Sequence, residues 1–275
     1  MIKACEFMAY KDGKYATGEI RPGLFSRIAP SVVFYSRIIP IVYRASVTAK
    51  AGFYGDDEWA KDSCEIFRHI ENTGLKVEID GAENFQNLDG PCVFLGNHMS
   101  TMETFFLPGM IVPYRRTTFV VKQSLVDYPF FGHIMKRCDP VTVGRKNPRD
   151  DLKAVLEGGK ERLGKGISII IFPQTTRRQY FSPAEFNTIG EKLAQRSGVP
   201  IIPLAVKTDG WAEGRFIKDL GRVHPEKTAH YSFGKPIRIE GKGRDAHSEI
   251  VSFISGKLRN WGVEIRDEGK EPEGQ

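Results

Sequence analysis

His98 and Glu103 stand five residues apart in FLGNHMSTMETFFLPG, residues 94–109. A histidine titrates near neutral pH and can take a proton from a hydroxyl, and a nearby carboxylate can hold its imidazole in one tautomer. The spacing alone is a weak indication, because six histidines and 34 acids in 275 residues give about 0.7 such pairs by chance. Ser100 and Glu103 also form a capping-box pattern, which predicts only a helix that begins at Thr101. Both interpretations are open, and they are compatible in part.

Two later stretches place basic side chains directly after apolar runs. VTVGRKNPRDDL contains Arg145, and ISIIIFPQTTRRQYF contains Arg177 and Arg178. Guanidinium groups match phosphate oxygens in pairs, so both stretches could contact an anion. For Arg145 a solvated turn before a helix is an equal alternative. A fourth stretch, SGVPIIPLAV, is apolar enough for a core strand and carries no chemical signal of its own.

Several common catalytic motifs are absent from the sequence. It has no G-x-S-x-G, no H-E-x-x-H and no G-x-G-x-x-G, so no covalent serine nucleophile, zinc protease site or dinucleotide fingerprint is visible. GGKERLGKGIS nearly matches a phosphate-binding loop, but Gly166 replaces the required Ser or Thr. The predicted order there is helix then strand, the reverse of that motif, so nucleotide hydrolysis is rejected.

The elements that must position these residues follow from the alternation of patterns. Short apolar runs (PCVFLGN, TTFVV, DPVTV, GISIIIF and VPIIPLAV) alternate with helix-like stretches around 101–111, 124–137, 149–163 and 189–197. This predicts an α/β fold with a largely parallel mixed sheet covered by helices on both faces. Ligands bind such sheets outside the carboxyl ends of the strands. The loops after Leu95, Val143 and Phe172 are therefore the predicted site.

The basic excess is concentrated near the N-terminus. The net charge is +6, and residues 21–50 contain four arginines and one lysine but no acid, interleaved with aliphatic and aromatic side chains. We predict that residues 1–55 form a basic amphipathic segment that associates with a membrane surface. The alternative is an amphipathic segment packed on the domain. Pro30, Arg37 and Pro40 argue against a spanning helix.

The remaining boundaries and exclusions are simpler. Residues 56–262 are predicted to form the α/β domain, and 263–275 a polar tail. Nucleic-acid binding is not expected, because aliphatic residues dilute the basic ones. The four cysteines are far apart and form no C-x-x-C pair, which predicts neither a disulfide framework nor a zinc site and is typical of a reducing compartment.

Taken in order, NHMSTMET, VTVGR, FPQTTR and VPIIPLAV resemble the four motifs of the glycerolipid acyltransferase family, best known for 1-acylglycerol-3-phosphate acyltransferases. In that family the first motif is N-H-x-S-x-x-D, the third is F-P-E-G-T-R and the fourth is a V-P-I-x-P strand. The intervening segment, which contains Lys122, also resembles the family's linker. The resemblance covers about residues 85–210 and is specific through the order and spacing of its motifs.

The resemblance implies transfer of a fatty acyl group from acyl-CoA or acyl carrier protein to a lysophospholipid hydroxyl, by a peripheral enzyme on the cytoplasmic face of a membrane. His98 would be the general base and Glu103 its orienting carboxylate, with no enzyme nucleophile, metal or cofactor. The positions it assigns to substrate binding are Asn97, Ser100, Lys122, Arg145, Gln174, Thr175, Thr176 and Arg177.

This chain departs from the family pattern at two places. Glu103 replaces the usual Asp, which adds one methylene to the carboxylate. Gln174 and Thr175 replace Glu and Gly, which removes a charge near the acceptor and predicts an acceptor other than lysophosphatidic acid. Two alternatives to an acyltransferase remain: a catalytically silent lipid-binding relative, and a thioester hydrolase in which His98 activates water.

Overall fold

A central sheet organises the chain. The computed structural model describes residues 8–174, 176–215, 217–241 and 243–266, so Thr175 and most of the predicted tail lie outside the described residues. Eight described strands form one sheet in the order β1-β2-β8-β7-β3-β6-β4-β5. Their bounds are β1 Tyr15–Ala16, β2 Lys76–Asp80, β3 Val93–Gly96, β4 Thr117–Lys122, β5 Val141–Val143, β6 Ser168–Ile171, β7 Ile201–Lys207 and β8 Thr228–Phe233.

Five neighbouring strands, β7, β3, β6, β4 and β5, run parallel to one another. Strand β8 pairs antiparallel with β7 and parallel with β2, and β1 pairs antiparallel with β2. The predicted largely parallel mixed sheet is therefore confirmed. The carboxyl ends of the five parallel strands share one edge, with β3 between β7 and β6.

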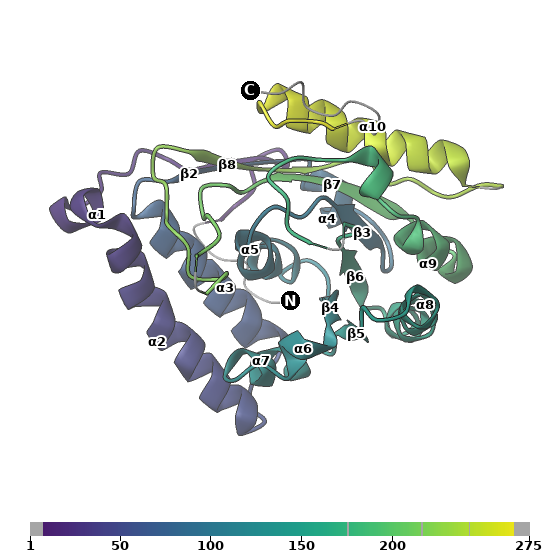
Figure 1. Cartoon of the computed structure of the whole chain (residues 1–275), viewed down its shortest axis with the longest axis horizontal. Coiled ribbons are helices and arrows are strands. Elements are labelled where there is room, and N and C mark those ends of the chain that lie inside the picture. The colour runs from purple at the N-terminus through teal and green to yellow at the C-terminus, as the bar shows by residue number, and fades with distance from the viewer. Residues whose placement is uncertain (1–7, 175, 216, 242, 267–275) are drawn as a thin grey trace.

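Helices cover both faces of the sheet (Figure 1). One face carries α8 (Pro148–Gly164), α9 (Ile189–Ser197) and α10 (Arg244–Asn260). The other carries α2 (Pro30–Lys50), α3 (Asp56–Glu71), α5 (Met102–Ile111) and α7 (Phe131–Arg137). The remaining short helices are α1 (Leu24–Ile28), α4 (Glu83–Gln86), α6 (Gln123–Val126) and the 3₁₀ turn Pro183–Glu185.

The strands are apolar on both faces because each face has its own core. Val93 and Leu95 of β3 pack in the core beneath α8, α9 and α10, whereas Phe94 between them packs in the core beneath α3 and α5. Ile169 and Ile170 of β6 divide in the same way. This alternation is the period of two that a pleated strand imposes, and it gives the continuous apolar runs seen in the sequence.

Helix α2 is continuous from Pro30 to Lys50, although its prolines were expected to interrupt the segment. Pro30 occupies the first turn, where its missing N–H costs nothing, and packing of the buried face holds the helix together around Pro40. Phe34, on the buried face, makes an edge contact with Trp211 at 4.9 Å. Within the described residues, no helix has the length and apolar character needed to cross a bilayer.

The opposite side of this N-terminal region is exposed and carries large apolar side chains together with basic ones such as Arg37 and Arg44. Its exposed large apolar side chains are Leu24, Phe25, Ile28, Val32, Ile39, Tyr43, Val47 and Phe53. The segment is thus packed on the α/β core along one face and open along the other. The interpretation as a packed segment describes the buried face, and association of the exposed face with a membrane surface stays a prediction.

The cysteines depart from expectation at one position. Cys92 and Cys138 are free and buried, whereas Cys64 is disulfide-bonded. The sequence predicted no disulfide framework, and its cysteine spacing gave no signal for the bond at Cys64. Cysteine spacing consequently gives no support to a reducing compartment.

Candidate active site

The loops after β3 and β6 meet at the shared edge of the sheet. Gly96 ends β3 so close to β7 that a Cβ there would lie 2.9 Å from the carbonyl oxygen of Leu204. The chain then turns outward at His98, whose carbonyl accepts a hydrogen bond from the Arg178 N–H at 2.9 Å. The side chain of Gln179 adds a second link, from its Nε2 to the carbonyl of Met99 at 3.3 Å. The first and third sequence motifs are therefore one site.

The imidazole ring of His98 is held at its edge by Glu103 and on its face by Phe172. Its Nδ1 lies 2.8 Å from Oε2 of Glu103, which is fully buried, while the His98 side chain is 15% exposed. Its ring stacks on Phe172, with centroids 4.4 Å apart and planes 8° from parallel. An ionised carboxylate only accepts hydrogen bonds, so beside such a group Nδ1 would carry the proton and Nε2 would keep a free lone pair.

Glu103 is surrounded by donors besides His98. Its Oε1 accepts from the N–H groups of Met99 at 3.2 Å and Ser100 at 2.9 Å, and from the Thr208 hydroxyl. Oε2 accepts from the Ser100 N–H at 3.0 Å as well as facing His98. Such a carboxylate is well satisfied in its ionised form despite full burial.

The same contacts settle the question of the capping box. The Ser100 hydroxyl accepts from the Met102 N–H at 3.0 Å, while Glu103 bonds back to the Ser100 N–H. The predicted capping box is therefore present only in part: α5 begins at Met102, not at Thr101, and the Ser100 hydroxyl accepts from Met102 instead of Glu103. Glu103 caps the helix and contacts His98 at once, so the two interpretations hold together.

A buried phenol also lies in the field of this carboxylate. Burial, and after it the negative charge of Glu103, raise the pKa of Tyr231 well above its ordinary value. Tyr231 is fully buried, and no described group hydrogen-bonds to its hydroxyl. It therefore remains neutral and adds no second charge beneath the site.

Three residues predicted to bind substrate have well-defined places beside the pair. Asn97 donates to the Val206 carbonyl at 2.8 Å and accepts from the Val206 N–H at 2.9 Å, which extends the pairing of β3 with β7. Gln174 is buried, and its Oε1 accepts from the His98 N–H at 3.4 Å. Its Nε2 is buried without a partner among the described groups. Thr176 is exposed on the same loop.

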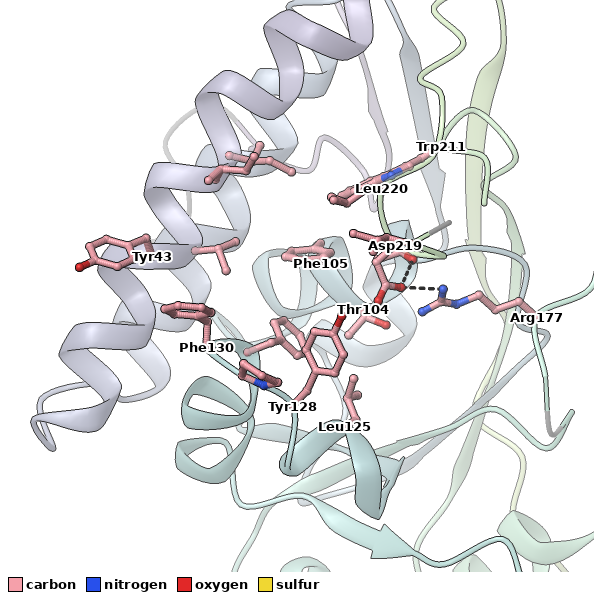
Figure 2. A pocket seen from close by; sticks show the side chains of 17 residues that line it. Tyr43, Thr104, Phe105, Leu125, Tyr128, Phe130, Arg177, Trp211, Asp219 and Leu220 are labelled. Carbon is pink, nitrogen blue, oxygen red and sulfur yellow. Dashed lines mark hydrogen bonds and ion pairs between the residues drawn. The ribbon is translucent and has the colours of Figure 1, made fainter. Parts of the chain in front are cut away.

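Arg177 reaches toward the start of α5 and is already ion-paired (Figure 2). Its Nη1 lies 2.7 Å from Oδ1 of Asp219 and 3.8 Å from Oε1 of Glu213. The same Asp219 oxygen accepts from the Thr101 hydroxyl at 2.8 Å. In this structure the predicted anion-binding arginine faces two acids of its own chain.

Lys122 and Arg145 lie farther along the sheet edge. Lys122 is exposed at the end of β4, two strands from β3, and Arg145 follows β5, three strands from β3. At the usual strand spacing these offsets are about 10 and 14 Å. The N–H groups of Gly144 and Arg145 donate to Oδ1 of Asp151 at 2.9 and 3.1 Å. The topology thus places these two basic residues apart from the His98 pair.

Sequence reasoning missed Thr208, Phe172 and Asp219 as parts of the site. Thr208 directly follows β7, so the rule that ligands bind outside the carboxyl ends of parallel strands also points to it. The β7 stretch, SGVPIIPLAV, was assigned to the core alone from its apolar character, and that rule was not applied there. Phe172 was used only to mark a strand end. Asp219 lies in the β7–β8 connection, and no local signal marks it.

Comparison with known proteins decides the family. Residues 76–207 match the family model described as Acyltransferase. The 1-acyl-sn-glycerol-3-phosphate acyltransferase of Pseudomonas aeruginosa is 33% identical over 192 residues, which cover 70% of each chain. The chain belongs to the glycerolipid acyltransferase family.

One further relative agrees with this membership, and one solved structure shares the fold. The 1-acyl-sn-glycerol-3-phosphate acyltransferase of Haemophilus influenzae is 26% identical over 202 residues, or 71% of this chain and 78% of that one. The crystal structure of the 1-acyl-sn-glycerophosphate acyltransferase PlsC from Thermotoga maritima matches with a TM-score of 0.60 at 16% identity, covering 84% of this acyltransferase and 93% of that chain. The latter likeness shows that the fold is shared.

The acyltransferase has an apolar cavity of about 420 Å³ next to the His98 loop. Figure 2 shows side chains from α2, α5, the α6–α7 region and the β7–β8 connection around it. Thr101 and Arg177, which flank His98 through the two joined loops, lie at one end. The remaining lining is almost wholly aliphatic and aromatic, including Phe105, Phe130 and Trp211. Such a cavity fits a hydrocarbon chain better than a polar ligand.

Proposed function

We propose that this acyltransferase moves a fatty acyl group from an acyl thioester, acyl-CoA or acyl carrier protein, to a hydroxyl of a lysophospholipid-like acceptor. The observation that carries the proposal is the buried, fully hydrogen-bonded Glu103 carboxylate at 2.8 Å from His98 Nδ1, at the carboxyl ends of parallel strands. The names of the relatives, 1-acyl-sn-glycerol-3-phosphate acyltransferases, support the class of acceptor.

In the proposed reaction His98 acts directly on the acceptor. Its Nε2 takes the hydroxyl proton as the oxygen forms a bond to the thioester carbonyl carbon, whose oxygen becomes an oxyanion. The intermediate then collapses, the carbon–sulfur bond breaks, and the departing sulfur receives the proton from His98. The products are an ester and a free thiol, and no acyl-enzyme is formed.

Glu103 would orient the ring and stabilise its protonated state. The carboxylate charge favours the imidazolium that forms during the reaction, and the Nδ1 hydrogen bond keeps Nε2 as the basic nitrogen. Phe172 restricts the ring from its face, so the base is preorganised before substrate arrives. We propose positioning roles for Asn97 and Ser100, since both are buried and hydrogen-bonded within the fold.

The other predicted contacts keep their assignment to the acceptor and donor head groups. Lys122, Arg145, Thr176 and Arg177 lie on loops at the same edge of the sheet, and Gln174 lies directly behind His98. Thr175 belongs to the same proposed set and lies outside the described residues. We propose that the apolar cavity takes an acyl chain, because one of its ends adjoins the His98 loop.

Residues 1–55 are proposed to hold the enzyme on the cytoplasmic face of a membrane as a peripheral protein. Support comes from the exposed apolar side chains of α1 and α2 together with a stretch, 21–50, that has basic but no acidic residues. Replacing Phe25 and Ile28, which are 79% and 73% exposed, with serine should weaken cosedimentation with anionic vesicles. Serine at the exposed Tyr114, on the α5–β4 connection, is the matched control. Equal loss in both variants would contradict the assignment.

The test of function is acceptor-dependent release of free thiol from acyl-CoA and acyl carrier protein, with a panel of lysolipids in mixed micelles. We expect His98→Ala to lower the rate by about a hundredfold to ten-thousandfold. His247→Ala is the matched control, because His247 also lies beside a glutamate, at 2.7 Å from Glu191. Retention of activity in His98→Ala would exclude the proposed base.

Two other outcomes identify the alternatives. Thiol release at the same rate with and without acceptor, together with free fatty acid, identifies a thioester hydrolase. Lysolipid binding without any thiol release, unchanged in His98→Ala, identifies a silent lipid-binding protein.

A further inference from the structure

Two carboxylates of the same chain lie where Arg177 was predicted to bind the anion of a substrate. Asp219 lies 2.7 Å from its guanidinium (Figure 2), and Glu213 lies 3.8 Å from it, so one cation faces two carboxylates. An arginine that awaits a phosphate would leave its paired donors open. Here Nη1 is taken by Asp219, and a phosphate that approached the other guanidinium nitrogens would still lie close to the charges of Asp219 and Glu213.

Asp219 is held in place from two sides. The Thr101 hydroxyl, at the start of α5, donates to the same Oδ1 that Arg177 contacts. The connection that carries Asp219 is fastened to α2 through Tyr35, whose hydroxyl donates to the Gly221 carbonyl at 2.5 Å and accepts from Trp211 Nε1 at 2.9 Å. Gly221 itself is packed so tightly that a Cβ would lie 1.7 Å from the Ala212 carbonyl oxygen.

The charges around the cavity balance. Arg177 and Asp219 are the charged residues among the described side chains that line it, so its polar end has no net charge. Two further features point the same way. The backbone donors of Gly144 and Arg145 are taken by Asp151, and the side chain directly behind His98 is the neutral Gln174.

We propose that Asp219, supported by Glu213, determines acceptor specificity, and that the enzyme prefers lysolipids whose head group has no net charge over those that end in a phosphate monoester. This inference rests on the proposed function. A phosphate monoester carries close to two negative charges near pH 7. Beside Arg177 it would either meet the charges of Asp219 and Glu213 or have to break the Arg177–Asp219 pair, whereas a zwitterionic or uncharged head group leaves the pair intact.

The experiment compares three acceptors with the same acyl chain: lysophosphatidic acid, lysophosphatidylethanolamine and monoacylglycerol, each in neutral mixed micelles. We expect the parent enzyme to have its lowest kcat/KM with lysophosphatidic acid. Asp219→Asn should lower KM for lysophosphatidic acid by about fivefold to tenfold, because it removes a partly exposed ion pair and a repulsive charge. The change in KM for the other two acceptors should be smaller, because a head group without net charge gains little from removal of the Asp219 charge.

Two variants serve as comparisons. Glu213→Gln should also lower KM for lysophosphatidic acid, but by a smaller factor, since Glu213 lies farther from Arg177 than Asp219 does. Asp209→Asn should leave acceptor preference unchanged, because Asp209 lies on the same connection but pairs with Lys227 at 2.7 Å and Lys207 at 3.9 Å. A parent enzyme that prefers lysophosphatidic acid, or an Asp219→Asn variant that changes all three acceptors equally, would overturn the inference.

Absence of thiol release with every acceptor would instead count against the proposed function. Calorimetric binding of short-chain lysophosphatidic acid, without a donor, then tests Asp219 alone. Tighter binding to Asp219→Asn than to the parent supports the inference, and equal or weaker binding refutes it.

Discussion

Two histidine–glutamate pairs in this protein have almost the same geometry. His98 Nδ1 lies 2.8 Å from Glu103, and His247 Nδ1 lies 2.7 Å from Glu191. In each pair the carboxylate is buried and the imidazole is partly exposed. Each pair also lies next to a hollow, and that lined by Glu191 and His247 is about 360 Å³. Distance, burial and a cavity therefore do not distinguish an acid–base site from a structural pair.

The surroundings of the carboxylate differ. Glu103 receives hydrogen bonds from two backbone N–H groups and from Thr208 in addition to His98, whereas Oε2 of Glu191 is buried without a partner among the described groups. Five of the six histidines have a glutamate oxygen within 4.0 Å, so such pairing has little value as a signal. Several independent hydrogen-bond donors around the carboxylate, at the carboxyl ends of the parallel strands, distinguish the His98 pair better than the histidine–glutamate distance does.

The strongest test of this difference exchanges the carboxylates for amides. In Glu103→Gln the single remaining oxygen must serve the donors at Met99, Ser100 and Thr208, so the NH₂ group turns toward His98 Nδ1. That forces the proton of His98 onto Nε2 and removes the base. We expect thiol release to fall by about a hundredfold or more, and Glu191→Gln to change it by less than about twofold.

The rate measurement needs a check on folding, which near-ultraviolet circular dichroism of both variants supplies. If Glu103→Gln kept more than about a third of the parent rate, the carboxylate would have no role in holding the tautomer.

Stability should separate the two pairs as well. Glu103→Ala leaves several buried donors without an acceptor and should lower the free energy of unfolding by about 3 kcal/mol. Glu191→Ala should lower it by less than about 1 kcal/mol, because Glu191 already has an unpartnered oxygen and the 27% exposed His247 can reach water. Urea unfolding measures both. Equal losses would mean that the extra donors around Glu103 contribute nothing.

A smaller effect should follow removal of one supporting hydroxyl. Thr208→Val keeps the shape of the side chain but deletes its hydrogen bond to Glu103, so we expect kcat to fall by about threefold to tenfold. Thr73→Val is the matched control, since the buried Thr73 hydroxyl bonds to the Ile70 carbonyl at 2.6 Å at the end of α3. A fall in kcat of similar size in both variants would show a general loss of stability instead.

The smallest effect concerns pH and a histidine outside both pairs. Burial lowers the pKa of His230 below its ordinary 6.5, although Glu78 opposes the change. The unfolded chain therefore binds more protons than the folded chain just below pH 6.5, so the free energy of unfolding falls as the pH drops through that value. His230→Gln should show a shallower fall between pH 7 and pH 5 in urea unfolding. If the fall in the free energy of unfolding kept the same slope in His230→Gln, other groups would cause the pH dependence. His69 is one such group, because burial also lowers its pKa.

Much of the fold could be predicted because the pattern of the parallel strands is local. Strands β3, β5, β6 and β7 are apolar on both faces, and each ends in a polar or basic loop, so their edge could be placed from sequence alone. The continuity of α2 could not, because burial of Phe34 and Ile38 overrides the local effect of Pro40.

The candidate site divides in the same way. His98 and Glu103 are five residues apart and come together through one turn. Thr208 and Asp219 reach their partners Glu103 and Arg177 across 105 and 42 residues of sequence, so only the order of the strands brings them into contact. A motif search therefore finds the proposed base and misses Thr208 and Asp219, which hold its neighbours Glu103 and Arg177 in place.

Tyr35 joins two parts of the molecule that have different surroundings. It lies on α2, whose outer face is exposed and carries large apolar side chains, and it hydrogen-bonds to Trp211 and to the backbone of the connection that carries Asp219. If α2 rests in a lipid interface as proposed, its depth there would also set the height of Asp219 and Arg177 above the acyl chains. Reaction rate would then vary with lateral lipid packing and curvature, even at a constant surface density of acceptor.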